Sequence, residues 1–194
     1  MTEPSDPIGR FITLLEDAKR TDLAEPTAFI LATAGADGKP SARVVLLKAV
    51  DERGFVFYTN LESHKAKELM AVKFAALCFY WPPLRQQVRV EGRVDRISDA
   101  EADAYFATRP RGAQLGAWAS RQSEPLSGRA ELEERLKAFE EEFAGREVPR
   151  PPFWSGYRII PDRIEFWEYR EDRLHDRTVY SNRDGTWAVQ KLYP

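Results

Sequence analysis

Side chains able to bind an anion are concentrated near the C-terminus of the chain. The segment 164–167 (IEFW) is followed by 173–177 (RLHDR). Side chains alternate between faces along a strand, so a strand here directs Arg173, His175 and Arg177 to one face. Three groups that can carry positive charge, close to the large ring of Trp167, favour a planar anionic ligand. The alternative is a solvated edge strand whose charges oppose aggregation.

The residue content excludes several other kinds of site. No G-x-G-x-x-G motif, P-loop or G-x-S-x-G motif is present, so a phosphate must be bound by side chains. Only His64 and His175 are available as imidazole ligands, which predicts no metal site. The single cysteine, Cys78, lies in the apolar segment 74–79 and is interpreted as a buried strand thiol.

Composition and charge limit the class of protein. The chain has 194 residues, of which 43% are hydrophobic and 31% charged, which predicts one soluble globular domain, 1–194. Its net charge of -2 argues against nucleic-acid binding by phosphate neutralisation. The first ten residues are polar and no apolar run can span a bilayer. We therefore expect a cytoplasmic protein without nucleic-acid or membrane partners.

The first half of the chain reads as one helix followed by an antiparallel meander. Asp6 and Pro7 suit a helix N-terminus, and the helix has an apolar face formed by Ile8, Phe11, Ile12 and Leu15. Strands are predicted at 28–33, 42–50 and 55–59, with a hairpin turn at Asp37–Gly38.

The middle of the chain combines short helices with two more strands. We predict helices at 63–70, from the Ser98/Glu101 capping box to about 108, and at 127–143. Strands are predicted at 74–80 and 86–97, and Val88, Val90 and Val94 share a face if Gly92 forms no bulge. The segment 109–112 is expected to end the second of these helices.

The C-terminal part is predicted to be mostly strand. Strands are expected at 157–160, 163–169, 174–180 and 186–192, with a turn at Asp184–Gly185. Many short strands and few helices predict a mainly β fold, a small antiparallel barrel with peripheral helices.

Five motifs give the chain a resemblance to the pyridoxine/pyridoxamine 5'-phosphate oxidases. They are EFW with RLHDR near the C-terminus, RVVLLK at 43–48, YTN at 58–60, SHK at 63–65 and RPRGAQLGAWASRQS at 109–123. The resemblance implies an antiparallel split β-barrel of the FMN-binding type. It also implies a homodimer with FMN at the interface, to which residues from about 150 to 194 contribute the signature and dimer contacts.

The same resemblance assigns residues to the cofactor. Strand alternation places Arg43 and Lys48 on opposite faces, which suits a phosphate contact for Arg43 and a substrate contact for Lys48. His64 replaces an arginine of the family pattern, which leaves Lys65 as the fixed charge of that turn. The implied FMN contacts are Arg43, Val44, Val45, Leu46, Leu47, Lys48, Tyr58, Thr59, His64, Lys65, Gln87, Gln122, Ser123, Trp167 and Arg177.

The resemblance also assigns residues to a phosphorylated substrate. Arginine, lysine and tyrosine all bind phosphate well. Ala113 stands where the family usually has serine, and only five residues precede Asp6 where the family often has a longer arm. The implied substrate contacts are Lys48, Tyr105, Arg109, Ala113, Arg173, Leu174 and His175, with Arg173 and His175 as the catalytic residues.

The implied reaction is an FMN-dependent oxidation. Pyridoxine or pyridoxamine 5'-phosphate gives up a hydride from C4' to flavin N5, O2 is the acceptor, and the products are pyridoxal 5'-phosphate and H2O2. Two alternatives are a related flavin oxidase of another heterocycle, such as a phenazine precursor, and a non-catalytic flavin-binding split barrel. Arg109 favours the phosphorylated substrate over the first alternative, and Arg173 with His175 favour catalysis over the second.

Overall fold

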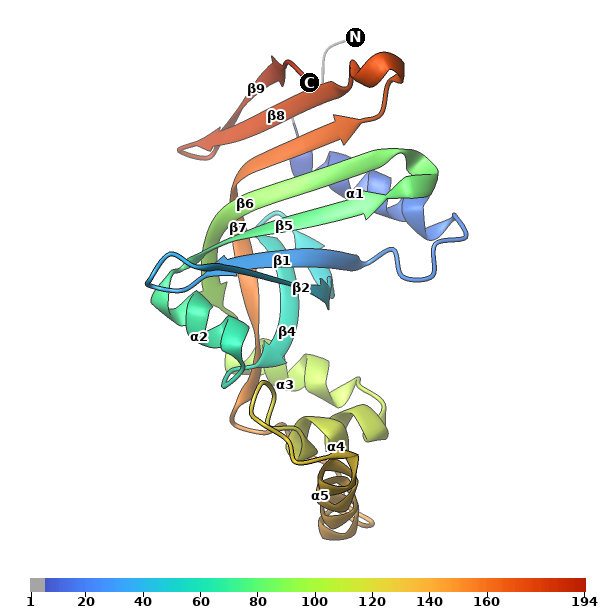
Figure 1. Cartoon of the computed structure of the whole chain (residues 1–194), viewed down its shortest axis with the longest axis vertical. Coiled ribbons are helices and arrows are strands. Elements are labelled where there is room, and N and C mark those ends of the chain that lie inside the picture. The colour runs from blue at the N-terminus through green and yellow to red at the C-terminus, as the bar shows by residue number, and fades with distance from the viewer. Residues whose placement is uncertain (1–5) are drawn as a thin grey trace.

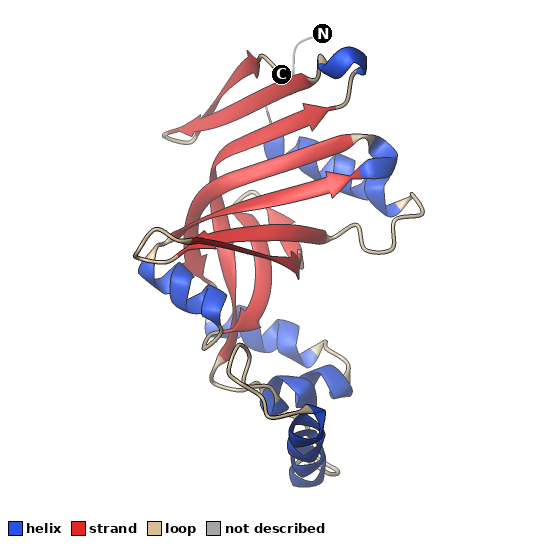
Figure 2. Ribbon diagram, in the orientation of Figure 1, coloured by secondary structure: helices blue, strands red, loops and turns tan. Residues whose placement is uncertain are grey.

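The computed structural model describes residues 6–194, so the expected short N-terminus, residues 1–5, lies outside the described residues. One curled antiparallel sheet forms the upper and middle parts of the molecule, and three helices gather at its lower end (Figures 1 and 2). The strands are β1 (Ala28–Ala34), β2 (Pro40–Leu46), β3 (Ala49–Asp51), β4 (Gly54–Asn60), β5 (Phe74–Trp81), β6 (Gln86–Arg96), β7 (Trp154–Glu168), β8 (Asp176–Arg183) and β9 (Thr186–Leu192). The helices are α1 (Pro7–Lys19), α2 (His64–Ala71), α3 (Asp99–Ala107), α4 (Arg111–Ala119) and α5 (Arg129–Glu142), with 3-10 turns η1 (Pro82–Leu84) and η2 (Glu171–Arg173).

The strand order explains the curl of the sheet. Within the described residues the order is β2-β1-β5-β6-β7-β4-β3, and β8 and β9 extend the sheet from the second half of β7. The first half of β7 pairs with β4 and its second half pairs with β8. Because one long strand changes partner along its length, the sheet opens at that point. The predicted mainly β, antiparallel split-barrel architecture is confirmed.

A bulge in β7 corrects the expectation of two separate strands at 157–160 and 163–169. Glu91 of β6 pairs with Arg163, and Gly92 pairs with Pro161, so Asp162 is the unpaired extra residue. The chain crosses Pro161 without leaving the sheet. A Cβ on Gly92 would lie 2.0 Å from the carbonyl oxygen of Ile160, so this close approach requires glycine.

Since the extra residue belongs to β7, the alternation of β6 is preserved. Val88, Val90 and Val94 are all buried on the core face, as predicted. They join a core in which Phe11 of α1 packs edge-on against Phe55 and Phe79, with ring centroids 4.8 and 4.9 Å away. Ile12, predicted to belong to the apolar face of this helix, is instead 36% exposed.

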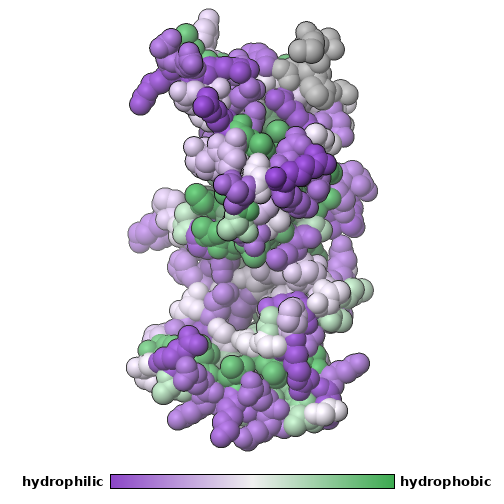
Figure 3. Space-filling model, turned by 90° about the vertical axis from the view of Figure 1, so that its right-hand side faces the viewer, coloured by the Kyte–Doolittle hydropathy of each residue, from purple (hydrophilic) through white to green (hydrophobic). Residues whose placement is uncertain are grey.

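The lower helices enclose a separate, smaller core. Phe106, Leu115, Phe143, Val148 and Trp154 pack together there, and Leu136 and Phe139 of α5 lie against them. Hydrophobic side chains also reach the surface in the middle and lower parts of the face shown in Figure 3, between hydrophilic ones. The cavity described next lies where these helices meet the sheet.

Candidate active site

A cavity of about 600 Å³ lies between the sheet and the lower helices. This volume is in the range of small-molecule and cofactor sites. Four basic residues contribute to its wall, and no Asp or Glu is found among the described residues that line it. The lining residues are Arg43, Val44, Val45, Leu46, Lys48, Tyr58, Thr59, Asn60, Lys65, Tyr105, Arg109, Ala113, Gly116, Ala117, Ser120, Gln122 and Trp154. The charge of this wall therefore favours an anionic ligand.

The strand is interrupted after Leu46, and this brings Arg43 and Lys48 to the same cavity. The predicted strand 42–50 ends at Leu46, because the next two residues bond to different partners. The Leu47 N–H donates to the Thr27 carbonyl and the Lys48 N–H donates to the Val56 carbonyl, each at 2.9 Å. The prediction that Arg43 and Lys48 lie on opposite faces of one strand is therefore wrong. Leu47 itself is buried in the main core and does not line the cavity.

Arg43 is held by a buried carboxylate. Its guanidinium donates to Glu68 at 3.2 Å and also to the hydroxyls of Thr33 and Ser41. His64 does not line the cavity; its Nε2 lies 3.1 Å from Oε1 of the same carboxylate, whereas Arg43 donates to Oε2. Burial alone would raise the pKa of Glu68, but hydrogen bonds from Ser41 and Thr33 and the charges of His64 and Arg43 hold it below its usual value.

Lys65 has a different environment from Arg43. Its ammonium is buried and donates to three neutral oxygens, those of Thr59 at 3.2 Å, Ser63 at 3.4 Å and Gln122 at 3.1 Å. Burial, and secondarily the charge of Arg43, lowers the pKa of Lys65. No carboxylate of residues 6–194 pairs with this ammonium, and a buried ammonium is costly unless an anion meets it. The position therefore fits a ligand phosphate.

Three nearly parallel aromatic rings form another part of the cavity wall. Tyr58 stacks on Tyr105 with a centroid distance of 3.9 Å and on Trp154 with a centroid distance of 5.3 Å. Arg109 lies over the Trp154 ring at 4.7 Å. Burial raises the pKa of both tyrosines, so their hydroxyls stay protonated and able to donate.

Sequence reasoning missed α4 and, with it, the position of several lining residues. The segment after Arg109 was expected only to end a helix, but Pro110 is the N-cap of a new one. The spacing of Leu115, Trp118 and Ala119 is helical and could have revealed it. This helix places Ala113 at the cavity. Asn60 and Trp154 were also not assigned, although both line the cavity.

A second group of the predicted residues lies elsewhere in the same chain. Gln87, Trp167 and Arg177 form one row across β6, β7 and β8, because Trp167 pairs with both of the others. The His175 ring lies 4.6 Å from the Trp167 ring, and its Nδ1 accepts from the Arg170 N–H at 3.1 Å. None of these side chains lines the cavity.

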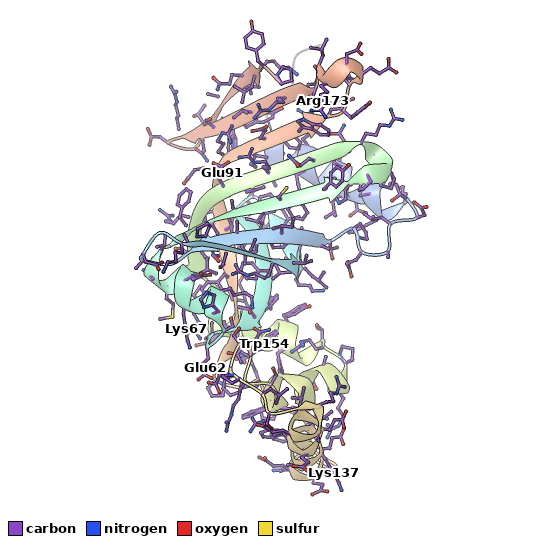
Figure 4. The ribbon with its side chains drawn as sticks, viewed as in Figure 1. Glu62, Lys67, Glu91, Lys137, Trp154 and Arg173 are labelled. Atoms are coloured by element: carbon purple, nitrogen blue, oxygen red, sulfur yellow. The ribbon has the colours of Figure 1, made fainter. Side chains whose placement is uncertain are left out.

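The prediction of a strand at 173–177 is wrong for residues 173–175. η2 ends at Arg173, whose φ is +61°, and β8 begins only at Asp176. Arg173, Leu174 and His175 are therefore carried by a turn, so strand alternation does not place them on one face. Arg173 and Leu174 are exposed. Figure 4 shows Arg173 at the upper end of the molecule and Trp154 at the lower helices, far apart along the long axis.

Ser123 is the remaining predicted residue outside the cavity. It lies in the loop after α4 with a φ of +75° and lines a smaller neighbouring cavity. Its neighbour Gln122 lines both cavities. The predicted residues thus fall into two groups. One lines the cavity, from Arg43 to Gln122, and the other lies at the row of Gln87, Trp167 and Arg177 and the adjoining turn 173–175. Three predicted residues belong to neither group: Leu47, His64 and Ser123.

Two family profiles match most of the chain. Residues 15–142 match the profile of pyridoxamine 5'-phosphate oxidase, and residues 154–194 match that of the pyridoxine 5'-phosphate oxidase C-terminal dimerisation region. The chain belongs to this family. The resemblance inferred from its motifs is confirmed, and β7 to β9 correspond to the family's dimerisation region.

Relatives and solved structures agree with this assignment. A pyridoxine/pyridoxamine 5'-phosphate oxidase of Myxococcus xanthus is 62% identical over 98% of this chain and 93% of its own length. The protein of that name from Rubrobacter xylanophilus is 59% identical over 97% of this chain and 87% of its own. The structure of PhzG from Burkholderia lata, in complex with tetrahydrophenazine-1-carboxylic acid, superposes with a TM-score of 0.93 at 34% identity, covering 98% and 94% of the two chains.

A more distant structure supports the fold alone. It is a pyridoxamine 5'-phosphate oxidase-related, FMN binding protein of Nostoc punctiforme, with a TM-score of 0.77 and 21% identity over 97% of this chain and 98% of that one. Within residues 6–194, no helix of this family member is long and apolar enough to cross a membrane, and no group of His, Cys, Asp and Glu is arranged to hold a metal ion.

Arg177 is anchored by a buried carboxylate, and this leads to a prediction on pH. Glu165 pairs with Arg177 at 2.8 Å, Arg163 at 3.0 Å and Arg89 at 3.8 Å. Burial opposes ionisation, but the hydrogen bond and charge of Arg177 and the charges of Arg89 and Arg163 lower the pKa of Glu165 below its usual 4.5. Its stabilising contribution is therefore present above about pH 4.5 and is lost as the pH falls through the lowered value.

Glu165→Gln is expected to destabilise the protein by about 1.5 kcal/mol at pH 7 and to make its stability less dependent on pH in acid. Glutamine keeps the shape but cannot titrate. Urea unfolding at pH 7 and at pH 4 measures both effects, with the exposed Glu133→Gln as the control. Equal slopes of stability against pH in wild type and Glu165→Gln would contradict the assignment.

Proposed function

We propose that this chain is an FMN-dependent oxidase that converts pyridoxine or pyridoxamine 5'-phosphate to pyridoxal 5'-phosphate with O2 as acceptor and H2O2 as product. The observation that carries the proposal is the cavity whose basic side chains have no acidic neighbour in its wall, with Lys65 buried beside neutral oxygens and one nitrogen of Arg109 buried without a hydrogen-bond partner. Two cationic positions carried by different parts of the fold, Lys65 in α2 and Arg109 between α3 and α4, fit the phosphates of a cofactor and of a substrate.

The residues present fit FMN. Arg43 and Lys65 are placed to bind its phosphate, and Lys65 has the unneutralised charge that such a contact needs. We assign Tyr58, Thr59, Gln122 and the backbone of 44–46 to the same ligand, because they line the cavity beside these cations. Bound FMN would supply the acceptor for the hydride from C4' and pass the electrons to O2.

The substrate phosphate is assigned to Lys48, Tyr105 and Arg109. Binding it away from the reacting carbon fixes the position of C4', so that remote binding energy helps orient the reaction. Arg173 is not a general base, because guanidinium stays protonated. We assign it to orienting the C4' substituent, and His175 to a hydrogen bond with the substrate.

These assignments require two copies of the chain. Gln87, Trp167, Arg173, His175 and Arg177 do not line the cavity of their own chain, and Arg173 lies far from Trp154 of the cavity wall (Figure 4). We propose that these five residues complete the cavity of a partner copy, with FMN between the subunits. Residues 154–194 match a dimerisation region.

An exposed apolar surface supports the same proposal. Ile30, Val44, Phe74 and Tyr80 are 46%, 65%, 47% and 58% exposed on the face of β1, β2 and β5 that points away from the core, and Val44 also lines the cavity. Such a surface is typical of a subunit interface. Light scattering of the flavin-loaded protein is expected to give the mass of a dimer; a flavin-loaded monomer would contradict the shared site.

One assay tests the proposed activity. Purified protein with FMN in air is given pyridoxine 5'-phosphate, and pyridoxal 5'-phosphate and H2O2 are measured together. We expect equal amounts of both products, and much weaker turnover of unphosphorylated pyridoxine. A reduced phenazine carboxylate is the third substrate, because PhzG is 34% identical. Turnover of the phenazine compound alone, or of no substrate with FMN bound, would overturn the proposal.

Ala113 offers a test of the phosphate site. Ala113→Ser adds a hydroxyl at the cavity wall and is expected to lower the KM for pyridoxine 5'-phosphate by about two- to tenfold, as one hydrogen bond would. The KM for unphosphorylated pyridoxine should not change. Ala138→Ser on the exposed side of α5 is the control. An unchanged KM for the phosphate ester would show that another group already fills this place.

A further inference from the structure

Arg109 differs from the other cations of the cavity in how it is held. Its Nη1 is buried and has no hydrogen-bond partner among residues 6–194. No carboxylate of the described residues lies within ion-pair distance of it, whereas Arg43 is paired with Glu68. Burial lowers the pKa of Arg109, although the nearby Tyr105 opposes this shift. The guanidinium thus keeps its charge in a partly desolvated place without an anion to balance it.

Aromatic faces take the place of a carboxylate at Arg109. Its guanidinium carbon lies 4.7 Å from the centroid of the Trp154 ring and 5.5 Å from that of Phe106. Both distances are within the range of cation–π attraction, which is strongest for tryptophan. The ring face attracts a cation through its quadrupole but adds no net charge.

Trp154 is itself buried and held by several contacts. It is 7% exposed and begins β7, where its backbone pairs with Asn60. Its carbonyl accepts from Arg150 Nη1 at 2.7 Å, and its ring is parallel to that of Tyr58, with an interplanar angle of 8°. Because both the backbone and the ring of Trp154 are held in place, the ring can define the position of the guanidinium that lies over it.

We propose that Trp154 is a positioning residue that fixes Arg109 for the substrate phosphate while leaving its charge unneutralised. This inference rests on the proposed function, because it takes the phosphorylated substrate as the ligand of Arg109. A carboxylate would orient the guanidinium equally well but would cancel the charge that attracts the dianion and occupy its donors. The aromatic platform orients Arg109 and leaves its donors for the phosphate, which makes this end of the cavity selective for phosphate esters.

The test compares Trp154→Leu and Trp154→Phe in the FMN-loaded protein. Leucine keeps an apolar side chain without a ring face, and phenylalanine keeps a smaller ring. For Trp154→Leu we expect the KM for pyridoxine 5'-phosphate to rise about tenfold, with kcat within about twofold of wild type. For Trp154→Phe we expect a rise of about threefold. The KM for unphosphorylated pyridoxine should stay the same in both.

A matched control separates positioning from packing. Phe139→Leu removes a ring from the same lower core without touching Arg109, and it should leave every KM unchanged. Equal rises in KM for the phosphorylated and unphosphorylated substrates, or no rise in either Trp154 variant, would overturn the inference. If Trp154→Leu does not fold, Trp154→Phe decides by the same criterion.

A binding measurement keeps this inference distinct from the proposed activity. The FMN-loaded proteins are titrated calorimetrically with inorganic phosphate, which needs no turnover. Weaker phosphate binding in the Trp154 variants than in wild type supports the inference, even if wild type fails to oxidise the ester and the proposed function falls. Equal affinity in wild type and variants, or no phosphate binding to wild type, overturns it.

Discussion

Replacing Arg173 with leucine is expected to lower the rate of flavin reduction by at least about tenfold, equivalent to about 1.4 kcal/mol of barrier, while the protein keeps its FMN. A positively charged group placed where charge develops in a transition state contributes an effect of at least this size. Arg173 lies in an exposed turn with a φ of +61°, beside His175, and outside the cavity that holds the proposed phosphate contacts. Its loss should therefore change the reaction and leave cofactor binding intact.

Anaerobic stopped-flow reduction by pyridoxine 5'-phosphate measures this effect, with flavin content determined in the same samples. Arg183→Leu, which replaces the exposed arginine at the last position of β8, is the control. A wild-type reduction rate in Arg173→Leu would remove this residue from the reaction. Loss of FMN with a normal rate in the remaining holoenzyme would instead assign Arg173 to cofactor binding.

Replacing Arg109 with methionine is expected to raise the KM for pyridoxine 5'-phosphate by about 100-fold, equivalent to about 2.7 kcal/mol. Methionine has a similar length but neither charge nor donors. Because Arg109 is partly desolvated and has no carboxylate partner within the described part of the chain, its removal should also leave the melting temperature equal or higher. The combination of weaker binding with undiminished stability is the expected signature of a residue that serves the ligand.

The neighbouring arginine of the same motif is the matched control. Arg111 donates to the carbonyls of Arg146 and Phe143, at the end of α5, so Arg111→Met should lower the melting temperature and leave the KM nearly unchanged. Steady-state kinetics and thermal unfolding of the two variants measure both effects. The assignment would be contradicted if Arg109→Met lowered stability without changing the KM.

The strands were predictable where local signals agree with long-range pairing. Asp37–Gly38 and Asp184–Gly185 mark hairpins whose turn residues adopt the positive φ that such turns need, at Gly38, Asp184 and Gly185. The capping box of Ser98 and Glu101 is present as expected. In each case a few adjacent residues determine the backbone geometry.

The errors in prediction occur where distant partners determine the local structure. β2 ends at Leu46 because the next two residues bond to Thr27 and Val56, which no pattern within 42–50 reveals. Arg173 to His175 leave the strand for a turn, although their sequence alternates. Pro161 remains within β7 because Asp162 bulges opposite Gly92.

The candidate site was predictable in content but not in arrangement. Motifs singled out candidate anion-binding residues, and the structure brings Arg43, Lys48, Lys65, Tyr105 and Arg109 together at one cavity. The residues that hold them were not identified, because Glu68 and Trp154 act through contacts between segments far apart in the sequence. The division of the site into two separated groups likewise depends on the curl of the whole sheet.

Mixing two variants with impaired activity tests the proposed two-subunit site most directly. Arg109→Met and Arg173→Leu are unfolded together, refolded with FMN and assayed with pyridoxine 5'-phosphate at a concentration well below the KM of Arg109→Met. If the cavity of one chain is completed by Arg173 of the partner subunit, half of the dimers are mixed and each has one intact site. The account predicts recovery of about a quarter of wild-type activity, from the random pairing of two chains. Activity no higher than the mean of the separate variants would contradict it.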